Sequence, residues 1–243
     1  MTAQRSPWRF FDRIYCISLT DRSDRRASAA EEFSRVGLLA QVEFVTVRRH
    51  EENSEQGIFE SHMRCIDAGL AADARNIVVF EDDVIFRRYS ADTLRACIEF
   101  VSTRPWSLIF FGCLVRRSWR TENRSVLGIR YRSLAHAYAV NRPFAERLVQ
   151  RRWKGVAFDA VLRSEPGPFY SAYPGFAFQS DSPTDNIKGV RIDRWRRLCG
   201  GLCRIQKMNE FYHRHQTTII AAHILAGLAV AWLAASSFGS ALR

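Results

Sequence analysis

The feature of this sequence that most limits its fold is a series of short apolar runs that alternate with segments of helical spacing. Runs at residues 13–19, 42–47 and 76–80 are rich in residues that favour strands. Two further strands are expected at 107–111 and 134–140. Runs that are apolar along their whole length are typical of strands buried on both faces, as in a mostly parallel sheet.

Helical spacing separates these strands. Apolar residues recur at intervals of three and four over residues 28–36, 59–72, 91–102 and 143–151, and Gly37 follows the first segment in the position of a helix C-cap. Strands that alternate with helices predict an α/β fold, with a mostly parallel central sheet and helices on both faces. We expect this domain to occupy residues 1–187.

The remainder of the chain divides into a basic and an apolar part. The chain has 36 Lys and Arg against 25 Asp and Glu, a formal net charge of +11, and much of the surplus lies in residues 188–216. Residues 217–239 carry no formal charge and are long enough to cross a bilayer. A buried core helix is the alternative, and His223 within the run counts in its favour. We expect a C-terminal transmembrane helix.

The expected location follows from these two parts. No secretory signal is recognisable before the first strand, because charged residues interrupt residues 1–18. We therefore expect a tail-anchored protein on the cytoplasmic face of the inner (plasma) membrane, with residues 188–216 as a basic juxtamembrane segment beside anionic lipid. Net charge alone would also suit nucleic acid, but we expect no nucleic-acid partner.

Three consecutive carboxylates, Glu81, Asp82 and Asp83, lie between two hydrophobic runs. They follow a strand expected to be buried, and α/β folds bind ligands at the carboxyl ends of such strands. Three adjacent negative charges repel one another unless a cation compensates them, and a hard divalent ion with oxygen ligands is suitable. The segment therefore predicts a site for Mg²⁺ or Mn²⁺ that bridges to a diphosphate. A solvated turn, or a set of helix N-caps, is the alternative.

Two weaker signals occur earlier in the chain. Arg22 and Arg25 follow the first strand and precede a helix, where guanidinium groups could bind phosphate oxygens. Ser61 and His62 lie near the start of the next helix. Each of these signals also has an ordinary structural explanation, namely a solvated loop for the arginines and a packed or capping role for the histidine.

In combination, these motifs resemble glycosyltransferase family 25, the lipooligosaccharide galactosyltransferase type that also includes collagen galactosyltransferases. The resemblance covers about residues 12–187. It rests on residues 14–19 with Arg22, Asp24 and Arg25, on Gly57 with Ser61 and His62, and on the segments 80–84, 106–112, 135–140, 158–162 and 173–182. The sequence departs from the family at Ser18, where Asn is usual, and at Ile58, where Cys is usual.

The resemblance implies a GT-A-like, metal-dependent, inverting enzyme that transfers a hexose from a UDP-sugar. Galactose from UDP-galactose is the expected donor, with glucose left open, and a hydroxyl of a lipid-linked surface glycan such as lipooligosaccharide is the expected acceptor. It implies that Glu81 and Asp83 hold Mn²⁺ or Mg²⁺, and that Asp83 takes part in catalysis. The residues expected to bind the donor are Ser18, Arg22, Arg25, Ser61, His62, Asp82 and Gln179.

The general base is the least determined role. An inverting transfer needs one group to take the proton of the acceptor hydroxyl. Asp159 is the expected base, although it could instead be the N-cap of a helix over residues 160–163, and Asp181 and Asp185 are competing candidates. A different class of protein also stays open: a catalytically inactive transferase-like domain that binds a sugar or a partner at the membrane.

Overall fold

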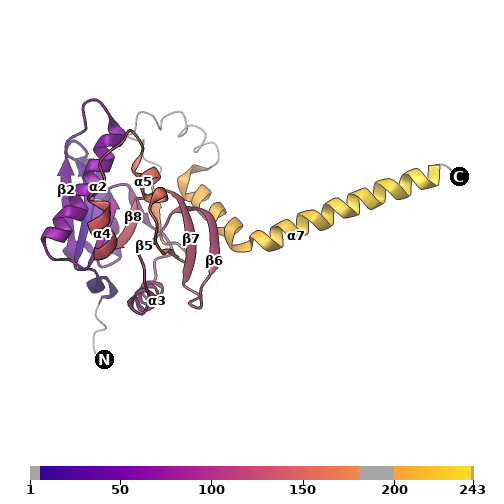
Figure 1. The fold of residues 1–243 in the computed structure, drawn as a ribbon, viewed down its shortest axis with the longest axis horizontal. Helices are drawn as coiled ribbons and strands as arrows, with labels where there is room; N and C mark the ends of the chain where they lie inside the picture. The colour runs from indigo at the N-terminus through magenta and orange to yellow at the C-terminus, as the bar shows by residue number, and fades with distance from the viewer. Residues whose placement is uncertain (1–5, 181–199, 242–243) are drawn as a thin grey trace.

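The computed structural model describes residues 6–180 and 200–241, with side chains of the last segment described up to residue 233. Its centre is an eight-stranded sheet in the order β2-β1-β3-β8-β5-β9-β7-β6 (Figure 1). The strands are β1 (Arg13–Leu19), β2 (Val42–Val47), β3 (Asn76–Glu81), β5 (Leu108–Phe110), β6 (Leu114–Arg120), β7 (Val126–Ser133), β8 (Ala137–Asn141) and β9 (Phe169–Ala172). A separate two-stranded sheet pairs β4 (Val84–Phe86) with β10 (Ala177–Gln179).

Helices cover both faces of the central sheet, which confirms the predicted α/β class. One face is covered by α1 (Ser23–Arg35), α3 (Ala91–Ser102) and the short helix η1 (Pro7–Phe10). The other is covered by α2 (Ser54–Ala71), α4 (Arg142–Leu148) and α5 (Phe158–Ser164). A further short helix, η2 (Leu39–Gln41), joins α1 to β2.

The sheet is more mixed than the sequence predicts. Three neighbouring pairs are parallel, β1 with β2, β1 with β3, and β5 with β9. The other four neighbouring pairs are antiparallel. Burial on both faces makes a strand apolar along its length whichever way its neighbours run, so the apolar pattern could not distinguish the antiparallel β8 from a parallel strand.

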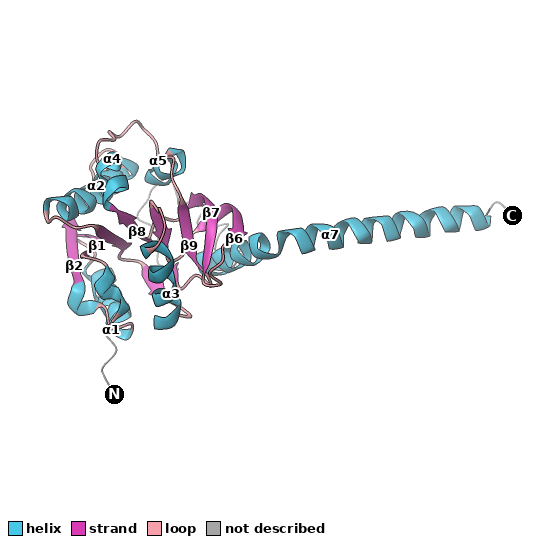
Figure 2. Cartoon of the chain, turned by 60° about the horizontal axis from the view of Figure 1, so that its bottom comes forward, coloured by secondary structure: helices cyan, strands magenta, loops and turns pink. Residues whose placement is uncertain are grey.

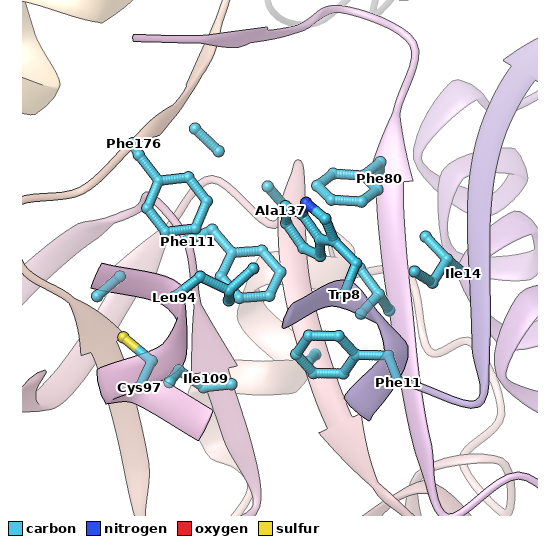
Figure 3. Packing of buried hydrophobic residues seen from close by; sticks show 14 of the residues in the cluster. Trp8, Phe11, Ile14, Phe80, Leu94, Cys97, Ile109, Phe111, Ala137 and Phe176 are labelled. Atoms are coloured by element: carbon cyan, nitrogen blue, oxygen red, sulfur yellow. The ribbon is translucent and has the colours of Figure 1, made fainter. Parts of the chain in front are cut away.

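Alternate residues of each central strand enter two separate cores. Phe80 of β3 packs on the α1 and α3 side, whereas the adjacent Val79 packs on the α2 and α4 side. Trp8 of η1 is fully buried in the first core, with its ring centroid 5.5 Å from that of Phe111 and 6.1 Å from that of Phe80 (Figure 3). Burial of aromatic rings on both sides fixes the strand register, because a one-residue slip would exchange the faces.

Two helices begin earlier than their apolar spacing predicts. The helix predicted from residue 28 begins at Ser23, and the helix predicted from residue 59 begins at Ser54. Asn53 caps the second, since its side chain accepts hydrogen bonds from the backbone N–H groups of Glu55 and Gln56. Both added turns are mostly polar, so the periodicity of apolar residues did not reveal them.

The last helix, α7 (Gly201–Ala241), has two parts joined at His215, whose backbone is not helical (φ −114°, ψ 15°). The first part packs against β6 and β10, and the second projects from the domain (Figures 1 and 2). Among the described residues, α7 is the one helix long and apolar enough to cross a membrane. Trp232 is 70% exposed in that projecting part.

Part of the predicted juxtamembrane segment belongs to the folded domain. Gln206 is only 2% exposed, and its side-chain amide donates to the carbonyl oxygen of Ala177 at 2.8 Å. Glu210 accepts from the backbone N–H of Gly175 at 2.7 Å. The domain boundary at residue 187 stays a prediction, because residues 181–199 lie outside the described part of the chain.

Candidate functional site

A cavity of about 280 Å³ lies where the carboxyl ends of β1 and β3 meet the first turns of α2 and α5. The polar and charged residues that line it are Ser18, Arg25, Arg48, Arg49, His50, Ser54, Glu55, Ser61, His62, Glu81, Asp82, Asp83, Asp159 and Gln179. Of the described residues proposed from the sequence for metal, donor or catalysis, the set includes all except Arg22. The cavity is therefore the candidate functional site.

The acidic turn is built by the end of one strand and the start of the next. Glu81 is the last residue of β3, Val84 is the first of β4, and the two aspartates form the turn between them. Gln179, at the end of β10, reaches the turn because β10 pairs with β4. Its side-chain nitrogen donates to Glu81 Oε2 at 3.3 Å and to Asp83 Oδ2 at 3.4 Å. The structure thus joins residues that are about a hundred positions apart in the sequence.

The electrostatics of the turn disfavour the charged forms of its acids. Burial raises the pKa of Glu81, and the negative charges of Asp159 and Asp82 raise it further. Burial and the charge of Glu81 likewise raise the pKa of Asp83. The opposing group is Arg25, whose guanidinium donates to Asp82 Oδ1 at 3.4 Å and lowers the pKa of its neighbours. Like-charged carboxylates with raised pKa values are found at functional sites because a bound cation or proton must compensate them.

The carboxylates fit a hard divalent cation. Asp83 Oδ1 is buried and accepts no hydrogen bond from the described residues. Within that same part of the chain, no three His, Cys, Asp or Glu side chains form a ready-made ligand set. Glu81 and Asp83 would therefore supply a pair of ligands, which is the usual protein share for Mg²⁺ when substrate phosphates and water complete the shell.

Asp159 lines the same cavity and is held there by β7 and by the residue that follows this strand. It is the second residue of α5, whose N-cap is Ala157, so the alternative of an Asp159 N-cap is wrong. The Tyr131 hydroxyl donates to Asp159 Oδ1, and the backbone N–H of Leu134 donates to Oδ2 at 3.1 Å. These two bonds fix the carboxylate beside the cavity. The competing candidates Asp181 and Asp185 lie outside the described residues.

His62 is buried between Glu81 and the aromatic rings of Tyr138 and Phe158. Its Nε2 lies 3.2 Å from Glu81 Oε1, its Nδ1 lies 3.1 Å from the Tyr138 hydroxyl, and its ring stacks on Phe158 at 4.1 Å. Burial lowers the pKa of His62 to about 3, so the imidazole is neutral at pH 7. A neutral ring donates from one nitrogen and accepts at the other. His62 can therefore connect Tyr138 to Glu81 and hold the orientation of that carboxylate.

The two serines contribute to the wall in different ways. Ser61 Oγ donates to the Gly57 carbonyl at 2.6 Å, within its own helix. Ser18 is 1% exposed and accepts a 3.3 Å hydrogen bond from Arg26. Its contact with Asp82 lowers the pKa of that carboxyl, which partly offsets the effect of burial.

Arg22 does not line the cavity. Its guanidinium makes a two-bond contact with Asp24, Nε to Oδ1 and Nη2 to Oδ2, each at 2.9 Å. This contact lowers the pKa of Asp24 to about 2. The pair lies at the start of α1. Arg22 acts on the site through its charge, which contributes to lowering the pKa of Asp82.

Sequence reasoning missed the basic wall after β2. Arg48, Arg49 and His50 line the same cavity as the acids. They directly follow the strand at Val47, and β2 is parallel to β1, so both strands end at the same edge of the sheet. Their place directly after a strand could have identified them as site residues, because the same argument located the acidic turn.

Comparisons with known proteins give similarity in overall chain path. No protein-family model matches the chain, and no curated protein matches it. Among solved structures, A197 from STIV is similar over 69% of this chain and 85% of its own, at 13% identity and a TM-score of 0.48. A glycosyltransferase involved in glycosylation of the major capsid of PBCV-1 is similar over 75% and 99%, at 11% identity and a TM-score of 0.44. A UDP-glucose pyrophosphorylase complexed with UDP-glucose covers 75% and 80%, at 9% identity and a TM-score of 0.41.

Proposed function

We propose that this chain is a GT-A-like glycosyltransferase of the family 25 type that transfers a hexose from a UDP-sugar with inversion. The proposed donor is UDP-galactose, the metal is Mn²⁺ or Mg²⁺, and the acceptor is a hydroxyl of a lipid-linked surface glycan such as lipooligosaccharide. The supporting observation is the acidic turn Glu81–Asp82–Asp83, which lines the same cavity as Arg25, Gln179 and Asp159.

The acids and the arginines of the cavity would bind different parts of a charged donor. When bound at Glu81 and Asp83, the cation would act as a Lewis acid that stabilises charge on the leaving diphosphate. Arg48 and Arg49 lie on the basic wall, where guanidinium groups suit phosphate oxygens. Gln179 holds the two acids together through its amide, so both carboxylates are oriented before a ligand arrives.

Asp159 is the proposed general base. Its carboxylate lines the cavity and is fixed by Tyr131 and the Leu134 N–H. Each oxygen of a carboxylate has two lone pairs, so both can accept one more hydrogen bond from an acceptor hydroxyl. Transfer of that proton to Asp159 as the new glycosidic bond forms would complete a single displacement.

The second part of α7 is the proposed membrane anchor. It is apolar, projects away from the domain, and its side chains from residue 220 to residue 233 are exposed. A charge-free helix of this length would bury those side chains in lipid. We place the domain on the cytoplasmic face of the inner membrane, where the basic residues next to the helix favour retention.

A donor screen tests the proposal. The full chain in detergent micelles or nanodiscs is incubated with Mn²⁺ and a panel of UDP-sugars, and released UDP is measured with and without acceptor saccharides. We expect turnover with UDP-galactose that EDTA abolishes and that Asp83→Asn lacks. Donor binding without turnover would instead favour the inactive sugar-binding alternative, and no binding of any UDP-sugar would contradict both.

A further inference from the structure

The first part of α7 is attached to one end of the sheet, at the edge strand β6. Asn209 is the main contact: its side-chain oxygen accepts from the Val115 N–H at 2.8 Å, and its nitrogen donates to the Val115 carbonyl at 3.1 Å. The side chain thus occupies backbone groups at the open edge of the sheet. Figures 1 and 2 both show that α7 leaves the domain beside β6. The end of the sheet that carries β6 is therefore the end nearest the projecting helix.

This end of the domain is covered with arginine. We define the basic end face as the exposed arginines of β6, of β7 and of the turn between them: Arg116, Arg117, Arg120, Arg124, Arg130 and Arg132. In the described part of the chain, none of the six forms an ion pair with a carboxylate. Arg117 lies directly opposite Arg130 in the strand pairing. Like charges in cross-strand pairs are destabilising, so this arrangement favours an external anion.

Exposed apolar side chains occur on β6 and on the part of α7 that packs against it. Trp119 of β6 is 48% exposed, and Phe211 and Met208 in the first part of α7 are 62% and 60% exposed. Aromatic residues beside arginines are characteristic of the membrane–water interface, where rings reach the headgroup level and guanidinium groups meet phosphates. A nucleic-acid surface would explain the arginines but not the apolar helix that leaves from the same end.

A hollow marks the place where α7 leaves the domain. Arg120, Arg124 and Arg214 line it together with Tyr173 and with Glu122, whose carboxylate is paired with Arg104. The Arg214 guanidinium lies 4.9 Å from the centre of the Tyr173 ring, one residue before the break at His215. Three guanidinium groups therefore surround a space next to the start of the projecting helix, at the depth where lipid phosphates would lie if that helix spans the bilayer.

We propose that the basic end face binds the headgroups of anionic lipids and holds the domain with β6 against the bilayer. The proposal rests on α7 as the membrane anchor and is independent of the transferase chemistry. It adds a second, electrostatic attachment to the apolar one. Two attachments fix the orientation of the domain, whereas a single helix leaves it free to tilt and rotate.

Hydrogen–deuterium exchange of the full chain in nanodiscs tests this proposal. We expect peptides over residues 114–133 to exchange more slowly in discs that contain phosphatidylglycerol than in discs of phosphatidylcholine alone. The difference should disappear in 0.5 M salt, because a Debye length of about 4 Å screens such contacts. The triple variant Arg117→Gln, Arg120→Gln, Arg130→Gln removes three charges. Since each arginine near an anionic surface contributes about five-fold in partitioning, the variant should lose about 100-fold of the docking equilibrium.

A matched triple variant controls for net charge. Arg9, Arg64 and Arg75 are exposed and lie away from β6, so their replacement by Gln should leave the protection unchanged. Unfolding midpoints of both triple variants check that the fold is retained. Equal exchange in the two lipid compositions, or loss of protection in the control as well, would overturn the proposal. Donor binding measured on the same discs reports separately on the transferase proposal, and failure of the chain to enter discs would contradict the anchor itself.

Discussion

The replacement Asp83→Asn should stabilise the protein in the absence of metal while removing its response to metal. Glu81 Oε2 and Asp83 Oδ2 share one amide nitrogen of Gln179. Those two oxygens therefore lie at most about 7 Å apart, and two unit charges at that separation repel by about 2 kcal/mol at an effective dielectric constant of about 20. Asn has the same shape and can still accept from Gln179. Its introduction should raise the free energy of unfolding by about 2 kcal/mol.

The sign of the effect with pH follows from the raised pKa of Asp83. Between the ordinary carboxyl pKa and the raised one, the folded protein keeps a proton that the unfolded chain has released, so wild-type stability falls as pH rises through this window. The gain from Asp83→Asn should be largest above the raised pKa of about 8, where both carboxylates are ionised, and should vanish well below the ordinary carboxyl pKa, where Asp83 is protonated in both states. For a chain of this size, about 2 kcal/mol corresponds to about 5 °C in unfolding midpoint.

Thermal unfolding of the full chain in detergent, with EDTA or with Mn²⁺, measures both parts of the prediction. Wild type should gain stability from Mn²⁺, and Asp83→Asn should not. Asp67→Asn is the matched control, because Asp67 is exposed on α2 and does not line the cavity, and its midpoint should stay close to that of wild type. An unfolding midpoint in EDTA that is lower for Asp83→Asn than for wild type would refute the assignment of the acidic turn to a cation. An equal Mn²⁺-induced shift in wild type and Asp83→Asn would refute it as well.

Three further results are expected. Because metal binding must displace protons from Glu81 and Asp83, whose pKa values are raised, calorimetry should show Mn²⁺ affinity rising from pH 6 to pH 7.5, by up to about tenfold per unit for each proton released, and a constant affinity would contradict this. Asp159→Asn should lower kcat by about 10²–10⁴-fold in a UDP-release assay with little change in donor affinity, and an unchanged kcat would exclude Asp159 as the base. Gln206→Ala should lower the free energy of unfolding by about 1–3 kcal/mol, because the carbonyl of Ala177 is left without its buried donor, and a wild-type denaturant midpoint would show that this contact with α7 contributes nothing.

Most strands that the sequence revealed are buried among apolar residues, and β2, whose residues are half-buried or exposed, is the exception. β1 and β3 pack against apolar layers on both sides, so their composition alone marks them. β6 and β7 were missed because they carry several arginines at the end of the sheet, where β6 is not buried on either face beyond Val115, and a charged strand does not differ from a solvated loop by composition. β10 is only three residues long and is defined by its pairing with β4, a contact that no local pattern encodes.

The site was predictable where a chemical signal coincided with a strand end. Three adjacent acids after an apolar run located the acidic turn. The hydrogen bonds that hold Asp159 could not be foreseen, because Tyr131 donates from a strand that was itself not recognised. The roles of Arg22 and Arg25 could not be separated either, since only the folded chain shows that Arg22 contacts Asp24 and that Arg25 contacts Asp82.

The strand order sets how far from the lipid the reaction takes place. The cavity lies at β1 and β3, and five strand-to-strand spacings of about 4.8 Å separate β3 from β6, a span of about 24 Å. With β6 resting on the headgroups, Glu81 and Asp83 would lie about that far from the lipid. Asp159 lies nearer to it, because its partner Tyr131 belongs to β7, the strand next to β6. The donor would then be held on the side of the cavity away from the bilayer, and the acceptor would enter from the side that faces the lipid.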